Sequence, residues 1–375
     1  MLPPNETERK AIAKYLLASE LSGDSADLEF KAYFEYYNSV VCPSRWGDTW
    51  VKIDTPALRS HADLLTYTRS LYNNPSLSRD ELLEKSLSAK DVIPKEREYV
   101  ASVATKLAFM IDCTSKDYYS ENFRAKDDSL RPIKWEGNER LIDFLEKSFL
   151  YDIAQTAAQQ EKTSEALLRK NALKAWKLTR RYRIKIRATN NLFEHLLYDP
   201  RERVLKVFHH MAFLRAHLKR SKNESLDLGF QKSLELGTLP PQLLFETLVS
   251  FHAILFPIAS VGNKKSRSLL KKLIRTQNFD QDGLWVEFVR PIPSDITFTY
   301  WGDRLAKIYD VVKRPPPRNA FVSWLERHTS ERNALTVAII GLFLAVVFGF
   351  LAFIIGLVQL VVSWLAWRYP VSPVS

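Results

Sequence analysis

The seven histidines of this chain offer the few residue spacings that could support chemistry. His209, His210 and His217 fall in a segment whose pattern predicts one helix, and helical residues seven apart share a face. His210 and His217 could therefore ligate a metal ion together. No Cys, Asp or Glu stands at a matching position on that segment to complete a ligand set. We therefore predict no metal site.

We do not predict His195 to be a catalytic base. Apolar residues surround it on a predicted short helix, and this pattern is typical of a hydrogen-bonded core histidine. The sequence has no glycine-rich phosphate loop, no GxSxG and no HExxH motif. Its two cysteines, Cys42 and Cys113, are too few for a zinc site or a disulfide framework, and we expect two buried thiols. We predict no catalytic residue and no cofactor.

A basic segment at 161–222 is the strongest electrostatic feature of the sequence. It holds 17 Lys and Arg against five Asp and Glu, which accounts for essentially all of the net charge of +11. The heptapeptide RYRIKIR at 181–187 alternates basic and apolar side chains, so it predicts a half-buried strand with a basic outer face. The predicted basic surface consists of Arg169, Lys170, Lys174, Lys177, Arg180, Arg183, Lys185 and Arg187.

Such a surface suits an acidic protein or anionic lipid, although an ordinary solvated surface would look the same. Nucleic acid is the least expected partner, because no recognition helix, zinc finger or RNA-binding signature accompanies the charge.

The elements that must position these residues are mostly helical. Apolar spacing and capping signals predict helices at 6–21, from Asp54 to about Tyr72, after a Ser78–Glu81 capping box, at 95–112, at 191–198 and at 239–258. The last of these should be the central core helix. With only 11 glycines to supply tight turns, the fold class we expect is mainly α: a helical soluble domain with at most a short β element, followed by one transmembrane helix.

The transmembrane prediction rests on residues 334–367, which contain no charge and no proline. A span needs about 20 apolar residues, and this run is too short for two spans and a turn. Five Lys and Arg lie in 313–332, but only Arg368 follows the helix, so the large domain should be cytosolic. Eight residues follow Trp367, and no secretory signal opens the sequence. We therefore expect a single-pass, tail-anchored protein of the endoplasmic reticulum or later membranes.

One side of this helix carries small or polar residues at steps of three and four. Such residues let helices approach closely in lipid, so we predict a homo-oligomer formed through this small-residue face. The face consists of Gly341, Ala345, Gly349, Ala352, Gly356 and Gln359. The predicted organisation is a cytosolic domain at 1–312 with a possible internal boundary near 114–137, a Pro-rich linker and amphipathic stretch at 313–333, the span at 334–367 and a tail at 368–375.

Three segments of the second half, IKIRATNNLFEHLLYDPRERVLKVFHHMAFL, LPPQLLFETLVSFHAILFP and FTYWGDRLAKIYDVV, carry a resemblance. With the C-terminal helix, they resemble a group of filamentous-fungal proteins of uncharacterised function. The shared motifs here are Asn191, Leu192, His195 and Leu196, and then Trp301, Asp303, Arg304 and Leu305. The chain departs from the group at Arg187, where an aromatic residue is usual. The resemblance implies the same architecture and no activity.

Because the sequence offers no catalytic constellation, we expect a membrane-anchored, non-enzymatic interaction or adaptor protein on the cytosolic face. Two alternatives stay open at this point. One is an oligomeric channel or transport subunit whose helix contributes Thr336, Gln359 and Ser363 to a pore. The other is an enzyme that acts on an anionic substrate near Arg183 and Lys185.

Overall fold

The computed structural model of the chain divides into two compact units, Met1–Lys313 and Arg314–Ser375. The described residues are 1–17, 30–42, 45–46, 49–50, 58–87, 94–114, 134–149, 157–259, 263–293, 296–313 and 334–368. The predicted boundary segment at 114–137 lies largely outside them, as do the linker and amphipathic stretch at 314–333 and the tail at 369–375.

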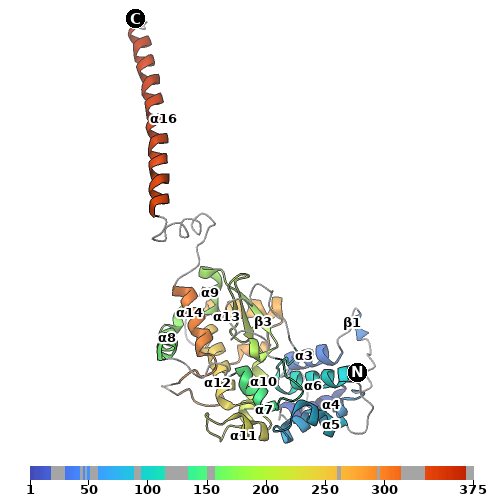
Figure 1. Cartoon of the computed structure of the whole chain (residues 1–375). Coiled ribbons are helices and arrows are strands. Elements are labelled where there is room, and N and C mark those ends of the chain that lie inside the picture. Colours follow the sequence, from blue (N-terminus) through green and yellow to red (C-terminus); the bar gives the residue numbers. More distant parts are fainter. Residues whose placement is uncertain are drawn as a thin grey trace. The chain divides into compact units, whose positions relative to one another are not determined.

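The first unit is built mainly from helices, as the sequence predicted (Figure 1). Its amino-terminal helices are α1 (Glu6–Ile12) with the π-helical η1 (Ala13–Leu17), α3 (Lys31–Val41), α4 (His61–Asn73), α5 (Arg79–Leu87), α6 (Pro94–Phe109) and α7 (Leu141–Phe149). Its later helices are α8 (Ala157–Leu168), η4 (Lys170–Ala172), α9 (Ala175–Tyr182), η5 (Leu192–Glu194), α10 (Met211–Arg220), α11 (Phe230–Glu235), α12 (Pro241–Val249), η6 (Ser250–Leu255), α13 (Lys264–Gln277), η7 (Gln281–Leu284) and α14 (Gly302–Lys313).

The strands are short and form two sheets. The hairpin β1 (Arg45–Trp46) and β2 (Thr49–Trp50) is antiparallel. The second sheet has the order β3-β5-β4, from β3 (Lys185–Thr189), β4 (Tyr198–Asp199) and β5 (Val204–Phe208). β3 and β5 pair in parallel, with Ile186 opposite Leu205, whereas β4 runs antiparallel to β5.

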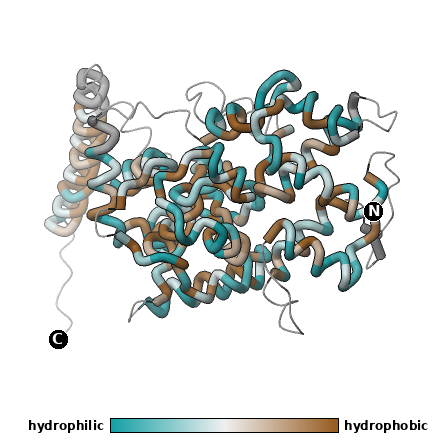
Figure 2. The backbone as a smooth tube through the Cα atoms, turned by 90° about the horizontal axis from the view of Figure 1, so that it is seen from below, coloured by the Kyte–Doolittle hydropathy of each residue, from teal (hydrophilic) through white to brown (hydrophobic). Residues whose placement is uncertain are grey.

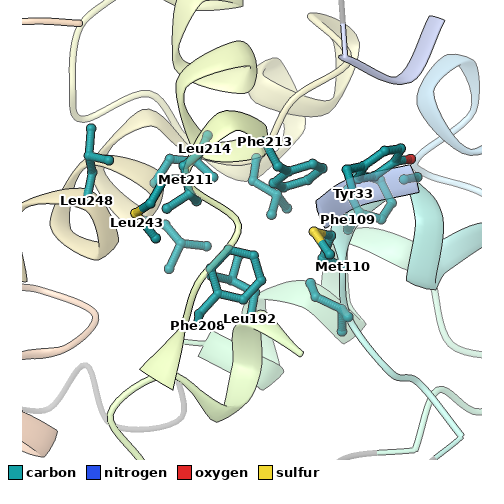
Figure 3. Packing of buried hydrophobic residues seen from close by; sticks show 14 of the residues in the cluster. Tyr33, Phe109, Met110, Leu192, Phe208, Met211, Phe213, Leu214, Leu243 and Leu248 are labelled. Atoms are coloured by element: carbon teal, nitrogen blue, oxygen red, sulfur yellow. The ribbon is translucent and has the colours of Figure 1, made fainter. Parts of the chain in front are cut away.

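A single apolar core joins the amino-terminal helices to the sheet and to α10 and α12 (Figure 3). Its contacts include the stacked rings of Tyr33 and Phe213, whose centroids lie 6.0 Å apart. The Tyr33 and Tyr72 hydroxyls donate to the carbonyls of Leu107 and Ala108 near the end of α6, so these buried phenols remain hydrogen-bonded. Hydrophobic and polar residues alternate along the surrounding helices, as expected of helices with one buried face (Figure 2).

The helix predicted at 239–258 is the buried α12, which continues as the π-helical η6. All its residues from Leu243 to His252 are buried, so this segment is central, as predicted. The Ser78–Glu81 capping box also forms: each residue's backbone N–H donates to the other's side chain.

Two predicted elements are wrong in extent. The strand expected at 181–187 begins only at Lys185, because Arg181 and Tyr182 end α9 and Arg183 is a left-handed cap with φ 57°. The helix expected at 191–198 is the three-residue η5, after which Leu196 has φ 60° and its N–H donates to the Lys206 carbonyl of β5.

The helix expected from Asp54 is described only from α4, which begins at His61 under a Ser60–Asp63 capping box. Asp54 itself lies outside the described residues.

The second unit contains the helix α16 (Ala334–Arg368). The 28 residues from Gly341 to Arg368 form a helix long and apolar enough to cross a membrane, and all of them are exposed. At 1.5 Å per residue, the 35 residues of α16 measure about 52 Å, which exceeds the roughly 30 Å hydrocarbon core of a bilayer.

Candidate interaction surface and buried polar centre

The predicted basic residues lie on three consecutive elements of the first unit. Arg169 and Lys170 belong to the turn around η4, Lys174 caps α9, Lys177 and Arg180 lie on α9, and Arg183, Lys185 and Arg187 follow on the turn and on β3. All are exposed except Lys174 and Lys177, which are half-buried. The outward side chains of β3 are basic, as the alternation predicted.

Helix α13 adds a second set of cations that the sequence analysis missed. Its 14 residues include six Lys and Arg and no acidic residue, and all six are exposed. These residues are Lys264, Lys265, Arg267, Lys271, Lys272 and Arg275. The amphipathic spacing of its apolar residues, Leu269, Leu270, Leu273 and Ile274, is enough to predict this helix. Its cations were missed because they lie outside 161–222, the segment with the largest excess of Lys and Arg.

Contacts at both ends join α13 to α9 and β3. At one end, Lys174 Nζ donates to Asn263 Oδ1 at 2.9 Å. Lys265 Nζ also lies 4.8 Å from the centre of the Trp176 ring of α9. At the other end, the Ala188 N–H of β3 donates to Gln277 Oε1 at 3.4 Å. Segments 174–189 and 264–277 therefore form one continuous region, the α9–β3–α13 surface.

The cations of this surface have no acidic counterparts. Its two segments carry 13 Lys and Arg and no Asp or Glu, and none of these cations forms an ion pair with another described residue. Burial and the neighbouring cations Arg181 and Lys174 lower the pKa of Lys177. Arg267, Lys271 and Arg275 also stand four residues apart on α13, a like-charge spacing that weakens a helix.

A different kind of polar cluster lies inside the unit, where residues 193–208, 242–250 and 299–304 meet. His195 Nδ1 accepts the Phe208 N–H, so Nε2 carries the proton and donates to Ser250 Oγ at 2.7 Å. The Arg304 guanidinium donates to the carbonyls of Phe193 and His195, both at 2.6 Å. His195 is fully buried, and burial and then Arg304 hold its pKa well below the usual range. It is a hydrogen-bonded core histidine, as predicted.

Glu246 anchors the same cluster. Its carboxylate accepts the backbone N–H groups of Thr299, Tyr300 and Trp301 at 2.6–3.0 Å, and the Gln242 amide at 2.8 Å. Burial raises the pKa of Glu246 to about 7, although these hydrogen bonds oppose the rise. Glu246 therefore ties α12 to the amino-terminal end of α14. We call the buried residues His195, Glu246, Ser250 and Trp301, together with the half-buried Arg304, the buried polar centre.

Asp280 holds the amino-terminal end of α10 in the way that Glu246 holds that of α14. Its Oδ2 accepts the N–H groups of Met211 and Ala212 at 2.8 and 3.3 Å. His209 and His210 precede α10 instead of lying on it, so the predicted single helix with His217 is wrong. Both imidazoles contact Asn190 Oδ1, and the His217 ring packs against Phe213. These histidines are parts of the core.

The predicted small-residue face lies along α16. Gly341 and Gln359 are 18 residues apart, which is five helical turns, so they lie on one side. A Cβ placed on Gly341, Gly349 or Gly356 would meet nothing within 4 Å, so these positions are open to a neighbouring helix.

No family model, curated protein or solved structure matches this chain.

Proposed function

We propose that this protein is a membrane-anchored, non-enzymatic adaptor that holds an acidic protein partner at the cytosolic face through the α9–β3–α13 surface. The observation that carries the proposal is the absence of acidic counterparts across that surface. Exposed cations at i,i+4 spacing on α13 repel one another. An anionic partner would reduce this repulsion and would also form new ion pairs.

The anchor supports the same proposal. The chain leaves the first unit at Lys313, whose Nζ lies 3.2 Å from Glu165 on α8, four residues before Arg169. Twenty residues separate Lys313 from α16, so they reach at most about 70 Å. Lys313 would therefore stay within that distance of the start of α16, which would keep a partner bound to the first unit close to the membrane.

The topology is part of the proposal: the first unit faces the cytosol, and α16 spans the membrane of the endoplasmic reticulum or a later compartment. The exposed sequons at Asn5 and Asn223 test it, because a cytosolic domain never meets the glycosylation machinery. We expect both to be unmodified in eukaryotic cells, whereas a sequon appended after Ser375 should be glycosylated. Glycosylation of Asn223 would contradict this topology.

Self-association through α16 would present several basic surfaces together, which raises avidity for a partner. Replacing Gly341, Gly349 and Gly356 with Leu should abolish cross-linked oligomers in membranes, since Leu side chains keep the helices apart. The matched control is Phe343→Leu with Phe350→Leu, which should leave oligomers intact. Unchanged oligomers in the glycine variant would contradict the small-residue face.

The deciding experiment is purification of the full-length protein in native-lipid nanodiscs, followed by identification of the proteins that come with it. The variant K271E/K272E reverses two exposed cations of α13. The control K222E/K232E makes the same charge change at exposed lysines outside the surface. We expect an acidic protein with the parent and the control, and its loss with K271E/K272E.

Retention of that protein by K271E/K272E would place the binding site elsewhere. Enrichment of anionic lipid without any protein would replace the adaptor proposal with a domain that docks on the membrane itself.

A further inference from the structure

A cleft of about 740 Å³ with polar and apolar walls borders the α9–β3–α13 surface at Ala188 and Thr189. It opens where β3 ends, and β3 pairs in parallel with β5. Its described walls include Thr189, Asn190 and Asn191 after β3, Tyr36 of α3, and Tyr99 and Lys106 of α6. In parallel sheets, the carboxyl ends of strands are where ligands usually bind, and the volume suits a small molecule.

The orientation of the Asn190 amide follows from the buried histidines behind it. His209 Nδ1 accepts the Asp280 N–H, so the proton of this neutral imidazole is on Nε2. That N–H donates to Asn190 at 3.1 Å, so the atom of Asn190 that faces it must be the oxygen. His210 Nε2 contacts the same oxygen at 2.7 Å. The Asn190 Nδ2 group therefore points the other way, and it has no hydrogen-bond partner among the described residues.

Asn191 is fixed in the same manner by backbone donors. Its Oδ1 accepts the N–H groups of Phe193 at 3.2 Å and Asp112 at 3.4 Å. Its Nδ2 group has no partner within the described part of the chain and is not enclosed. Two adjacent amide groups thus offer unused N–H donors at the cleft.

Each carboxylate of the cleft is already paired with a cation. Both oxygens of Asp112 are bound, one by Thr114 and the other by Lys106 Nζ at 3.2 Å. Glu194 accepts from Thr189 Oγ1 at 2.5 Å and from Lys206 Nζ at 2.6 Å. Glu98 is ion-paired through one oxygen: its Oε1 lies 3.6 Å from both Arg79 Nη2 and Lys134 Nζ. The cleft therefore offers the two amide groups and the remaining N–H groups of Lys106 as donors, while each of its carboxylates is paired with a cation.

We propose that this cleft binds a small organic acid with an apolar body. Its carboxylate would accept from Asn190 Nδ2, Asn191 Nδ2 and the Lys106 ammonium, since charge-assisted bonds of this kind are the stronger class. The apolar body would lie against Tyr36 and Tyr99. This site borders the α9–β3–α13 surface but uses none of the cations of that surface, so it stands whether or not the protein is an adaptor.

The test is a ligand-observed NMR titration of the full-length protein in nanodiscs with benzoate and 3-phenylpropionate. Benzamide and 3-phenylpropionamide serve as neutral analogues, and empty nanodiscs as the background. We expect saturable binding of the acids, with dissociation constants at least about tenfold lower than those of the amides.

The decisive variant is N190D/N191D. Each aspartate keeps an oxygen facing the buried donors, so the fold should hold, but a carboxylate oxygen replaces each N–H donor and repels an acid. We expect acid binding to weaken at least about tenfold, with about a fivefold loss for K106M. Asn171→Asp, an exposed position on η4, should bind like the parent. A thermal melt of each variant separates lost binding from lost folding.

Unchanged acid binding by a folded N190D/N191D variant would overturn the proposal. Equal binding of the acids and their amides, or no saturable binding of either acid at 10 mM, would overturn it as well.

Discussion

The buried polar centre and the α9–β3–α13 surface use charge in opposite ways. Inside, the Glu246 carboxylate has four donors and the Arg304 guanidinium has two carbonyl acceptors. On the surface, 13 cations have no acidic counterpart among the described residues. Buried polar groups need partners because water cannot reach them, whereas exposed cations are solvated and stay available to another molecule. The inner charges therefore stabilise the fold, whereas the outer charges are the ones that the proposed partner would contact.

The largest expected effect comes from removing Glu246. Glu246→Ala would leave three backbone N–H groups and the Gln242 amide buried without an acceptor. We expect the free energy of unfolding to fall by about 4 kcal/mol, and by about half as much in Glu246→Gln, which keeps one oxygen. Urea denaturation of the full-length protein in nanodiscs, followed by tryptophan fluorescence, measures this. A loss below about 1 kcal/mol in the alanine variant would show that the centre is not structural.

The pH dependence of stability tests the same buried groups together. Burial lowers the pKa of His195, His209, His210, His217 and His252, to about 3 for His209 and His252. Below about pH 6.5, the unfolded chain binds protons at these positions that the folded chain does not, so stability falls as the pH drops from 6.5 toward 3.

Two buried carboxylates act in the opposite sense. Burial raises the pKa of Glu246 and of Asp280 to about 7, so each contributes stability at acidic pH that is lost as the pH rises through 7. Because five histidines outnumber two carboxylates, we expect the free energy of unfolding to be at least about 3 kcal/mol lower at pH 4.5 than at pH 7. Denaturation curves at the two pH values check this, and equal stability would mean that the histidines are less buried than the structure has them.

A smaller effect is expected at the junction between α9 and α13. The Trp176 ring lies 4.8 Å from Lys265 Nζ and 5.7 Å from Lys177 Nζ. Trp176→Ala should lower the free energy of unfolding by about 1–2 kcal/mol, because the ring's packing and both cation–π contacts are lost. Trp176→Phe keeps an aromatic face and should lose less. If the two variants are equally stable, Trp176 does not hold the two helices together.

The same contrast explains how far sequence reasoning could go. Features that depend on residues close in sequence were predicted correctly. They are the Ser78–Glu81 capping box, the buried α12 and the apolar α16. The strand at 181–187 was predicted too long, because alternation of basic and apolar residues continues through the end of α9 and cannot reveal the left-handed turn at Arg183.

Features that depend on distant partners could not be predicted. The helix expected after Asn191 ends after three residues. The carbonyls of Phe193 and His195 instead accept hydrogen bonds from the Arg304 guanidinium, which is more than 100 residues away in sequence. The joining of α13 to α9 and β3 likewise appears only in the fold. The basic surface was therefore predicted at half its extent, and the cleft beside Asn190 was not predicted at all.

The smallest expected effect on stability is at the α9–β3–α13 surface itself, in K271E/K272E. A glutamate at 271 would stand four residues from both Arg267 and Arg275, which replaces like-charge repulsion with favourable i,i+4 pairs. We expect the melting temperature of the full-length protein to stay within about 2 °C of the parent or to rise slightly, while partner binding is lost. A melting temperature lowered by more than about 5 °C would mean that these lysines support the fold, and the loss of a partner would then no longer identify a binding surface.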